Sequence, residues 1–418
     1  MKRTLLRVGG LLVLLAVLSL GAAVGLAWVL GPPTYDEYSA GDFEFQKEGD
    51  VVAGKRLVEL TCVHCHYDPT TDSLAGRRLS PEYKALGFAH APNLTQDEVR
   101  GIGLWTDAEV VMLLRSGVHP KNKTRLPPWM PFHPNISDVD LANLLAYLRS
   151  DDPWVTPQRT SEQKSEVSFK YVLRAWLNWK PGPAQLTVVE RPPESEPIAL
   201  GAYLANDLLQ CHGCHSASAE KVDWVYPHKT EGFYQGGAKM TDFARNTVVS
   251  PGLTPSPKGG IGDWTYEEFR RGLVEGVTPV GKFLRWPMPT YPRLTEGELS
   301  AMYAYFQTLE PKHNKQKRAQ PYKVSPKIVD PGRHEFERMG CPSCHAPNAL
   351  GPLSLKKVPE KYPDDASLIE YISNPRFVDP NAWMRGYGKL ASDEEMSALV
   401  EYVRRRVERG PYAPPPKE

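Results

Sequence analysis

Cys62-Val63-His64-Cys65-His66 is the first of three Cys-x-x-Cys-His pentapeptides in this chain of 418 residues. The other two are Cys211-His212-Gly213-Cys214-His215 and Cys341-Pro342-Ser343-Cys344-His345, and together the three use all six cysteines. The pattern is typical of a c-type haem attachment site, where two thiols one helical turn apart bind the porphyrin and the histidine binds its iron. The sequence therefore predicts three covalently attached haems, held by Cys62, Cys65, Cys211, Cys214, Cys341 and Cys344, with His66, His215 and His345 as iron ligands.

Two other interpretations of the cysteines explain less. A structural zinc site usually combines two Cys-x-x-Cys pairs at short separation, whereas each pair here stands alone in its own segment. A disulfide within each pair would suit an exported chain, but it does not explain why a histidine follows every pair.

The overall charge gives no indication of a nucleic-acid partner. The chain has 50 basic and 49 acidic residues and a formal net charge of +1, so it lacks the basic excess typical of nucleic-acid binding. Its length suits several domains, and the three pentapeptides divide it into three parts that are each large enough to bury a core.

An uncharged run follows the basic residues at the amino terminus. Residues 8–30 carry no charge, and a helix of that length crosses a bilayer. A cleaved signal usually has a shorter apolar core, although Gly25-Leu26-Ala27 offers a cleavage site and keeps that alternative open. Basic residues before the run and none directly after it predict that the amino terminus stays in the cytoplasm. We therefore expect an anchor in a bacterial inner membrane, with the haem domains on the periplasmic side.

The first two parts of the chain are copies of one domain. Pro92-Asn93-Leu94-Thr95 matches Pro251-Gly252-Leu253-Thr254, and Gly101-Ile102-Gly103-Leu104-Trp105-Thr106 matches Gly260-Ile261-Gly262-Asp263-Trp264-Thr265. Each copy then begins a helix with a capping box, Thr106 with Glu109 and Thr265 with Glu268.

A further capped helix is expected to close each of the three parts. The caps of these helices are Ser137, Thr295 and Ser392. Glu298 and Glu395 complete a capping box with the last two caps, and Asp140 takes the equivalent position after Ser137. Apolar residues at four, seven, eight and eleven positions after each cap predict one buried helical stripe. A tyrosine follows every cap by ten residues, at Tyr147, Tyr305 and Tyr402.

Three methionines in equivalent loops are the predicted sixth iron ligands. A haem that only carries electrons needs a second axial ligand, and methionine is the usual one in this class. Met302 and Met396 fall where other copies have leucine or valine, so we expect them in the core, and Met112 aligns with Arg271 and cannot be a shared ligand. The remaining candidates, each shortly after a tryptophan and shortly before a closing cap, are Met130, Met288 and Met384.

The second nitrogen of each ligating imidazole is expected to donate to a backbone carbonyl, which fixes the orientation of the ring. A proline begins a short loop after each pentapeptide, and the carbonyls of Pro92, Pro251 and Pro352 are the predicted acceptors. His64 and His212, inside their pentapeptides, point away from the iron and are predicted to be surface residues.

All three parts of the chain resemble class I cytochromes c. Residues from about 50 to 310 further resemble the tri-haem cytochrome c subunits of membrane-bound alcohol and gluconate dehydrogenases. The residues that carry this resemblance are the matched blocks above, Gly201-Ala202-Tyr203-Leu204, Pro287-Met288-Pro289-Thr290-Tyr291 and Trp176-Leu177-Asn178-Trp179-Lys180-Pro181-Gly182-Pro183. The resemblance implies helical units that pass electrons from a dehydrogenase toward quinone or an oxidase. The third part is shorter and looks more like a single-haem cytochrome of another branch, and the amino-terminal run replaces the cleaved signal of those subunits.

These features predict a mainly α protein with three tandem class I cytochrome c domains behind one amino-terminal transmembrane helix. The expected parts are an anchor (1–32), a tether (33–49), a first domain (50–152), a linker (153–196), a second domain (197–312), a linker (313–328), a third domain (329–410) and a disordered tail (411–418). An aromatic amphipathic helix at residues 169–179 of the first linker is expected either to pack between the first two domains or to dock on a membrane or partner subunit.

The leading hypothesis is an electron-transfer protein rather than an enzyme. Three haems with histidine and methionine ligands would relay single electrons between a membrane or periplasmic redox partner and a respiratory or photosynthetic chain. A dehydrogenase subunit is the partner implied by the resemblance, and quinone, an oxidase or a reaction centre is also possible. The alternative is a haem enzyme, a peroxidase or small-molecule reductase, in which one iron lacks its sixth ligand, with Met384 the weakest candidate.

Overall fold

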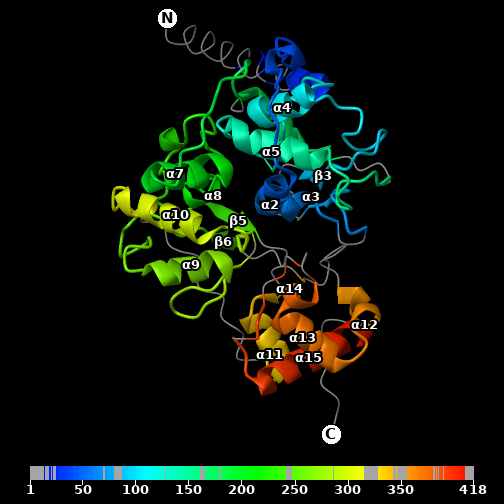
Figure 1. The fold of residues 1–418 in the computed structure, drawn as a ribbon, viewed down its shortest axis with the longest axis vertical. Coiled ribbons are helices and arrows are strands. Elements are labelled where there is room, and N and C mark those ends of the chain that lie inside the picture. Colours follow the sequence, from blue (N-terminus) through cyan, green and yellow to red (C-terminus); the bar gives the residue numbers. More distant parts are fainter. Residues whose placement is uncertain are drawn as a thin grey trace, which may run out of the picture.

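The computed structural model describes most of the chain between residues 25 and 409. The described residues are 14, 18–19, 21, 25–68, 71–79, 87–127, 129–160, 165–177, 180–241, 247–285, 287–314, 328–341, 345, 355–379, 382, 384, 386–388 and 390–409. Helices predominate among them, and the strands form antiparallel pairs (Figure 1). We call residues 50–152 the first segment, 197–312 the second segment and 329–410 the third segment.

Each segment begins and ends with a helix, and these two helices pack against each other. The pairs are α2 (Val51–Thr61) with α5 (Asp138–Leu148), α7 (Pro197–Tyr203) with α10 (Glu296–Thr308), and α11 (Pro331–Arg338) with α15 (Asp393–Arg409). One glycine lies at each crossing, namely Gly54, Gly201 and Gly332. A side chain there would collide with a backbone carbonyl of the closing helix and would lie 2.6–2.9 Å from the Cβ of Tyr147, Tyr305 or Tyr402. The tyrosine that follows each cap by ten residues is therefore the partner of this glycine in a close helix crossing.

The predicted helix starts are confirmed. Complete capping boxes begin α4 (Asp107–Ser116), α9 (Tyr266–Val274) and α10, and Ser392 and Glu395 exchange the same two hydrogen bonds before α15. The cap of α5 differs, because the side chain of Ser137 accepts from the amide of Asp140 while the carboxylate of Asp140 bonds to residues of other elements. The predicted apolar stripe is buried in all three closing helices, apart from Tyr303, which is half-buried.

Shorter elements connect these helix pairs. Around the first segment they are η1 (Ala40–Phe43), α3 (Val63–His66), β1 (Arg77–Arg78), β2 (Gly87–Phe88) and β3 (His90–Ala91), followed by β4 (Glu166–Val167) and α6 (Phe169–Leu177). In the second segment they are η3 (Leu204–Leu208), α8 (His212–His215), η4 (Pro227–Lys229), β5 (Lys239–Thr241) and β6 (Thr247–Val249). In the third segment they are η7 (Leu355–Lys357), α12 (Val358–Lys361), α13 (Asp365–Ser373) and α14 (Pro375–Val378). The strand pairs are β1 with β3, β2 with β4 and β5 with β6, all antiparallel.

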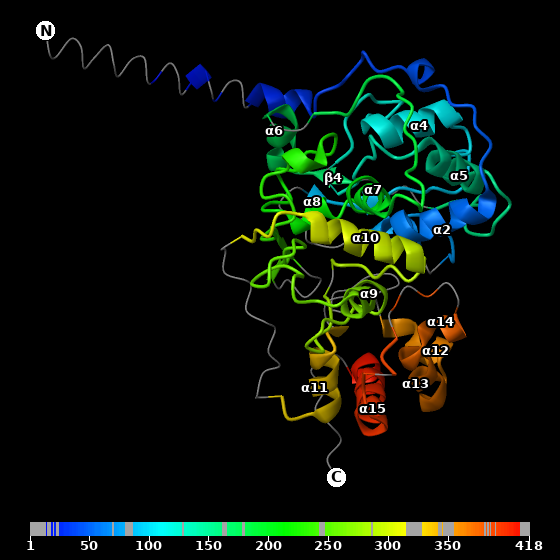
Figure 2. The same ribbon diagram turned by 60° about the vertical axis from the view of Figure 1, so that its left-hand side comes forward.

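One hydrophobic core runs through the first and second segments, whereas the third segment has a core of its own. Figure 2 shows the third segment as a separate body at the far end of the molecule from the amino-terminal helix. The stretch expected to be a tether contributes to the first core, because Phe43 is fully buried and the hydroxyl of Tyr38 donates to the carbonyl of Gly182 at 2.6 Å.

Two equivalent polar contacts join the first and second segments. From α2, Arg56 donates to both carboxylate oxygens of Glu298 near the start of α10, at 2.7 and 3.0 Å. From α7, the hydroxyl of Tyr203 donates to the carboxylate of Asp140 near the start of α5, at 2.6 Å. Arg56 and Tyr203 each lie two positions after the crossing glycine of their own segment. Their partners, Glu298 and Asp140, each lie three positions after the cap of the closing helix in the other segment. The first and second segments therefore pack reciprocally.

Arg191, from the linker between these segments, bridges the two contacts. Its guanidinium donates to Asp140 at 2.7 Å and to Glu298 at 2.9 Å. Burial alone would raise the pKa of Glu298, but the hydrogen bonds and charges of Arg56 and Arg191 hold that pKa below its ordinary value. Removing one member of a buried ion pair costs about 3–5 kcal/mol, so this cluster fixes how the two segments are placed.

In the described part of the chain, no helix combines the length and the apolar composition that crossing a membrane requires. Much of the predicted span at residues 8–30 lies outside that part. The described residues of the run are 14, 18–19, 21 and 25–30, all of them helical. The predicted tail at residues 411–418 also lies outside the described residues.

Candidate haem sites

A cavity of about 1010 Å³ in the second segment brings together the residues predicted to hold a haem. Cys211, Cys214, His215 and Met288 all line it. Most of the remaining lining is apolar, including Leu253, Ile261, Trp264, Phe269, Leu273 and Phe306. Its volume lies at the upper end of the range for small-molecule sites, and its walls suit a large, mostly apolar macrocycle.

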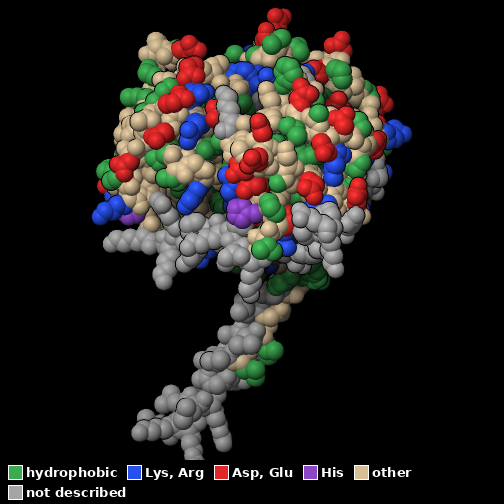
Figure 3. Space-filling model, turned by 90° about the horizontal axis from the view of Figure 1, so that it is seen from below, with side chains coloured by type: hydrophobic (Ala, Val, Ile, Leu, Met, Phe, Trp, Pro, Cys, Tyr) green, Lys and Arg blue, Asp and Glu red, His purple; other side chains and the backbone are tan. Residues whose placement is uncertain are grey.

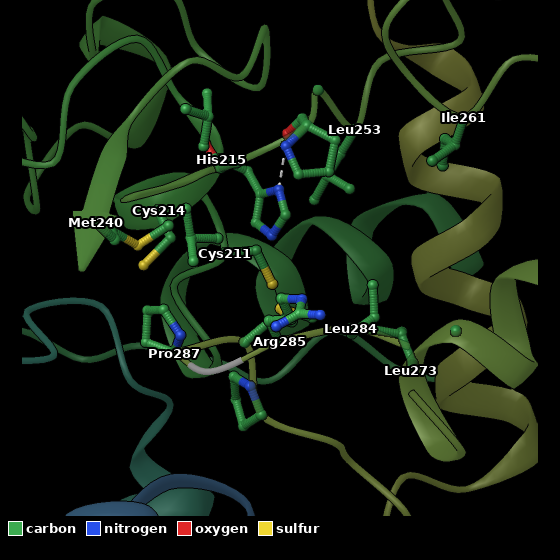
Figure 4. Close-up of a pocket in the computed structure, with 18 of the residues that line it drawn as sticks. Cys211, Cys214, His215, Met240, Leu253, Ile261, Leu273, Leu284, Arg285 and Pro287 are labelled. Atoms are coloured by element: carbon green, nitrogen blue, oxygen red, sulfur yellow. Dashed lines mark hydrogen bonds between the residues drawn. The ribbon is translucent and has the colours of Figure 1, made fainter. Parts of the chain in front are cut away.

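The imidazole of His215 is oriented toward this cavity. Its Nδ1 donates to the carbonyl of Pro251 at 2.9 Å, which is the hydrogen bond expected from the sequence. Figure 4 shows the ring pointing into the space beside Cys211 and Cys214, with this hydrogen bond on the other side of the ring. Burial lowers the pKa of His215 and so favours the neutral imidazole that binds a metal. These residues therefore fit a haem attached through both thiols, with Nε2 of His215 toward its iron.

The cations in the cavity lining were missed by the sequence analysis. Lys239 lies on β5, Lys282 and Arg285 lie in the loop that leads to Met288, and Arg338 comes from α11 of the third segment. A haem carries two carboxylate groups, and cations in a partly enclosed site compensate such charges. Two basic residues just before Met288 were a local signal for this role, whereas the approach of Arg338 depends on how the third segment docks.

Two other methionines also line the cavity. Met302 on α10 is fully buried in the core, as predicted. Met240 on β5 lies four residues after Gly236, whose amide donates to the carbonyl of His215 at 2.8 Å. The equivalent glycine in the first segment is Gly76, whose amide donates to the carbonyl of His66 at 2.9 Å. The position four residues after Gly76 is a serine in the sequence, so Met240 is not a shared ligand.

The first segment repeats the arrangement around its histidine. His66 is buried, and its Nδ1 donates to the carbonyl of Pro92 at 2.8 Å. Burial lowers the pKa of His66 to about 4, which again favours the neutral ring. Met130 is half-buried in the expected loop and follows the buried Trp129, whose ring packs on Tyr171 of α6 with centroids 5.8 Å apart.

Part of the third predicted site, including Cys344 and Pro352, lies outside the described residues. The amide of His345 donates to the carbonyl of Cys341 at 2.7 Å, and the equivalent bonds in the other two pentapeptides are both 2.9 Å. Cys341 and Met384 are half-buried against the core of the third segment. The described part of this site thus has the backbone turn of the other two.

The prediction that His64 and His212 are surface residues is wrong for His212. This ring is fully buried and packs against Trp224, Phe233 and Tyr234. His64 is half-buried, with its ring edge-on to Tyr291 and the centroids 5.9 Å apart. His212 is covered by later residues of its own segment and His64 by a residue of the second segment, and a local pattern reveals neither contact.

The methionine loop of each of the first two segments packs on the attachment region of the other. Tyr291, three residues after Met288, lines the second cavity and contacts His64 of the first pentapeptide. In the other direction, the side chain of Gln210 donates to the carbonyl of Phe132, two residues after Met130, at 2.7 Å. One aromatic side chain therefore separates the second cavity from the first pentapeptide.

The third segment meets the second beside the same cavity. Phe283 packs on Tyr387 with ring centroids 5.3 Å apart, and these residues lie close to Met288 and Met384 in the chain. Arg285 lies within 4 Å of the Cβ position of Gly340, directly before the third pentapeptide. The second candidate site is thus adjacent to both of the others.

Residues 51–151, which contain the first of these sites, match the family model described as cytochrome c. The first segment is a cytochrome c domain. Cytochrome c domains carry covalently bound c-type haem, the cofactor for which the Cys-x-x-Cys-His pattern is the attachment site.

The chain is also similar to several known cytochromes, two of which match it along much more of its length. It is 25% identical over 386 residues to the cytochrome c subunit of alcohol dehydrogenase (quinone) from Gluconacetobacter polyoxogenes, covering 82% of this chain and 77% of that one. It is 26% identical over 284 residues to a diheme cytochrome c-type protein from Cereibacter sphaeroides, covering 63% and 84%. A shorter match, 34% identical over 112 residues, joins it to the gluconate 2-dehydrogenase cytochrome c subunit of Pantoea cypripedii, covering 26% and 25%.

Proposed function

We propose that this chain is a membrane-anchored tri-haem c-type cytochrome that relays single electrons. The observation that carries the proposal is the convergence of Cys211, Cys214, His215 and Met288 on one cavity of sufficient size. When bound, haem supplies a one-electron iron couple. The protein's own residues attach the haem, fix the imidazole through a backbone carbonyl, and surround the macrocycle with apolar side chains.

The proposal extends this arrangement to three cytochrome c domains. The first segment has the same contact between histidine and proline carbonyl, and the third has the same turn between its first cysteine and histidine. The proposed iron ligands are His66 with Met130, His215 with Met288, and His345 with Met384. With a histidine and a methionine holding each iron, no position would remain for a substrate, so the role proposed is electron transfer rather than catalysis.

A dehydrogenase is the proposed electron donor. Two of the relatives named above are cytochrome c subunits of an alcohol dehydrogenase and a gluconate dehydrogenase. The acceptor proposed is a quinone or an oxidase of a respiratory chain. The uncharged run at residues 8–30 is the proposed anchor in the bacterial inner membrane, with the three segments on the periplasmic side.

Replacing the methionines one at a time tests the ligand assignment. Met130→Leu, Met288→Leu and Met384→Leu are each expected to remove the contribution of one haem to the long-wavelength absorption band of iron–methionine bonding, and to lower one reduction potential. Met240→Leu and Met396→Leu are matched controls, because Met240 lines the second cavity but has no counterpart in the first segment, and Met396 is in the third core.

The result that contradicts the proposal is a control that removes a band or a ligand variant that leaves the spectrum intact. An unchanged spectrum in Met384→Leu, together with carbon monoxide binding by the reduced unaltered protein, would indicate an open iron and a haem enzyme.

A further inference from the structure

Helix α6 has one buried face and one exposed apolar face. Its inner residues, Tyr171, Val172 and Ala175, are buried in a small core with Trp129. Its outer residues include Phe169, Trp176 and Leu177, which are 39, 47 and 68% exposed. Large apolar side chains grouped on two turns of an exposed helix indicate a surface that another body covers.

The end of the amino-terminal helix lies against this outer face. The ring of Trp28 packs edge-on against Phe169, with centroids 5.7 Å apart. The indole N–H of Trp176 donates to the carbonyl of Gly31 at 2.9 Å. Gly31 has a φ of 74°, the left-handed conformation that ends a helix. Both ends of α6 therefore contact the last residues of the amino-terminal helix, at the point where the uncharged run meets the folded body (Figure 2).

The described residues of that run are uncharged, and its large apolar side chains are exposed. They include Leu14, Leu18, Leu26, Val29 and Leu30. Figure 3 shows the described part of this run projecting from the body with hydrophobic side chains and without charged ones. Lys170 on α6 and Lys180, three residues after its end, are exposed. Tryptophan and lysine at the end of an apolar run are typical of a membrane–water interface.

We propose that α6 lies in the headgroup region of a lipid bilayer, with Phe169, Trp176 and Leu177 in contact with lipid. The inference rests on the anchor proposed above and adds a second membrane contact to it. A single spanning helix leaves the body free to tilt and rotate, whereas a second helix lying on the interface limits both motions. Lipid is favoured over a protein partner because the apolar face of α6 is continuous with the exposed end of the uncharged run.

This contact decides which haem site is closest to the membrane. Trp129, on the inner face of α6, directly precedes Met130. The third segment lies at the opposite end of the molecule from the amino-terminal helix (Figures 1 and 2). The first site therefore lies next to the bilayer and exchanges electrons with a carrier dissolved in it, while the third site faces away.

Photo-crosslinking to lipid tests the placement of α6. Full-length, haem-loaded protein with Leu177→benzoylphenylalanine is reconstituted in vesicles of phosphatidylethanolamine and phosphatidylglycerol and illuminated. The matched control is Val188→benzoylphenylalanine, because Val188 is 79% exposed and lies in the same linker. Mass spectrometry of the peptides is expected to find lipid adducts at position 177 and none at position 188.

Each other outcome overturns the inference in a distinct way. Vesicle-bound protein without lipid adducts at position 177 overturns the placement of α6 and leaves the anchor intact. Crosslinks from position 177 to a second copy of the chain identify a protein as the occupant of this face. Protein that does not bind vesicles overturns both membrane contacts, whereas the electron relay is tested separately by the methionine variants.

Discussion

Replacing Tyr203 with phenylalanine tests the contact that joins the first and second segments. The buried hydroxyl donates to the carboxylate of Asp140 at 2.6 Å and accepts from the backbone N–H of Ser137 at 3.0 Å. A hydrogen bond to a charged group contributes about 1.5–3 kcal/mol, and a buried N–H left without an acceptor costs about 1–3 kcal/mol. Asp140 keeps its ion pair with Arg191, so we expect Tyr203→Phe to lower the free energy of unfolding by about 3 kcal/mol.

The assay combines thermal unfolding with hydrogen exchange of the haem-loaded protein. For a unit of the size of the first two segments, a loss of about 3 kcal/mol lowers Tm by roughly 6–12 °C. Amides of α5 and α10 are expected to lose protection, while those of α15 keep theirs because the third segment has its own core. The control is Tyr226→Phe, in which a residue 51% exposed loses its hydroxyl, with an expected change within about 0.5 kcal/mol. If Tyr203→Phe behaves like this control, the reciprocal contact does not hold the segments together.

Three further predictions concern the helix crossing, a buried acid and the cavity cations. Gly201→Ala is expected to lower the free energy of urea unfolding by about 3 kcal/mol, because its Cβ would collide with the carbonyl of Ala301. At Gly297 the nearest atom to an added Cβ is the hydroxyl oxygen of Thr295 at 4.0 Å, so Gly297→Ala should stabilise the protein by up to about 1 kcal/mol. Equal effects would show that the crossing tolerates a methyl group. Burial raises the pKa of Asp207 from 3.8 to about 6, so the folded state holds its proton more tightly and loses up to about 3 kcal/mol of stability as the pH rises from about 4 to 6. Asp207→Asn is expected to remove this pH-dependent loss of stability. Parallel curves of unfolding free energy against pH for the unaltered protein and for Asp207→Asn would contradict the prediction. Arg285→Gln removes a positive charge from the lining of the second cavity and should lower one reduction potential in a spectroelectrochemical titration, whereas Arg270→Gln, at a residue of α9 paired with Glu267, should leave all potentials unchanged.

Local patterns in the sequence predicted the elements of this structure well. Capping boxes depend on residues three positions apart, so Thr106, Thr265 and Thr295 could be identified as helix starts without knowledge of the fold. The internal repeat pointed to the carbonyls of Pro92 and Pro251 as partners of the two histidines, since equivalent positions share a backbone geometry.

Features that depend on tertiary packing could not be predicted. His212 is buried by Trp224 and Phe233 from later in its own segment, and Arg338 reaches the second cavity from another segment. Asp140 stands where a glutamate completes the box in other copies, but it bonds to Tyr203 and Arg191 instead. The tyrosine ten residues after each cap was visible as a pattern, and its reason became clear only when the facing glycine was located.

Intact-mass spectrometry of the mature protein tests the central claim most directly. The account predicts a mass equal to the polypeptide plus three haem groups, with one haem on the peptide that contains each Cys-x-x-Cys-His motif. A mass with any other number of haems, or a motif whose two cysteines are recovered as free thiols or as a disulfide, would contradict it.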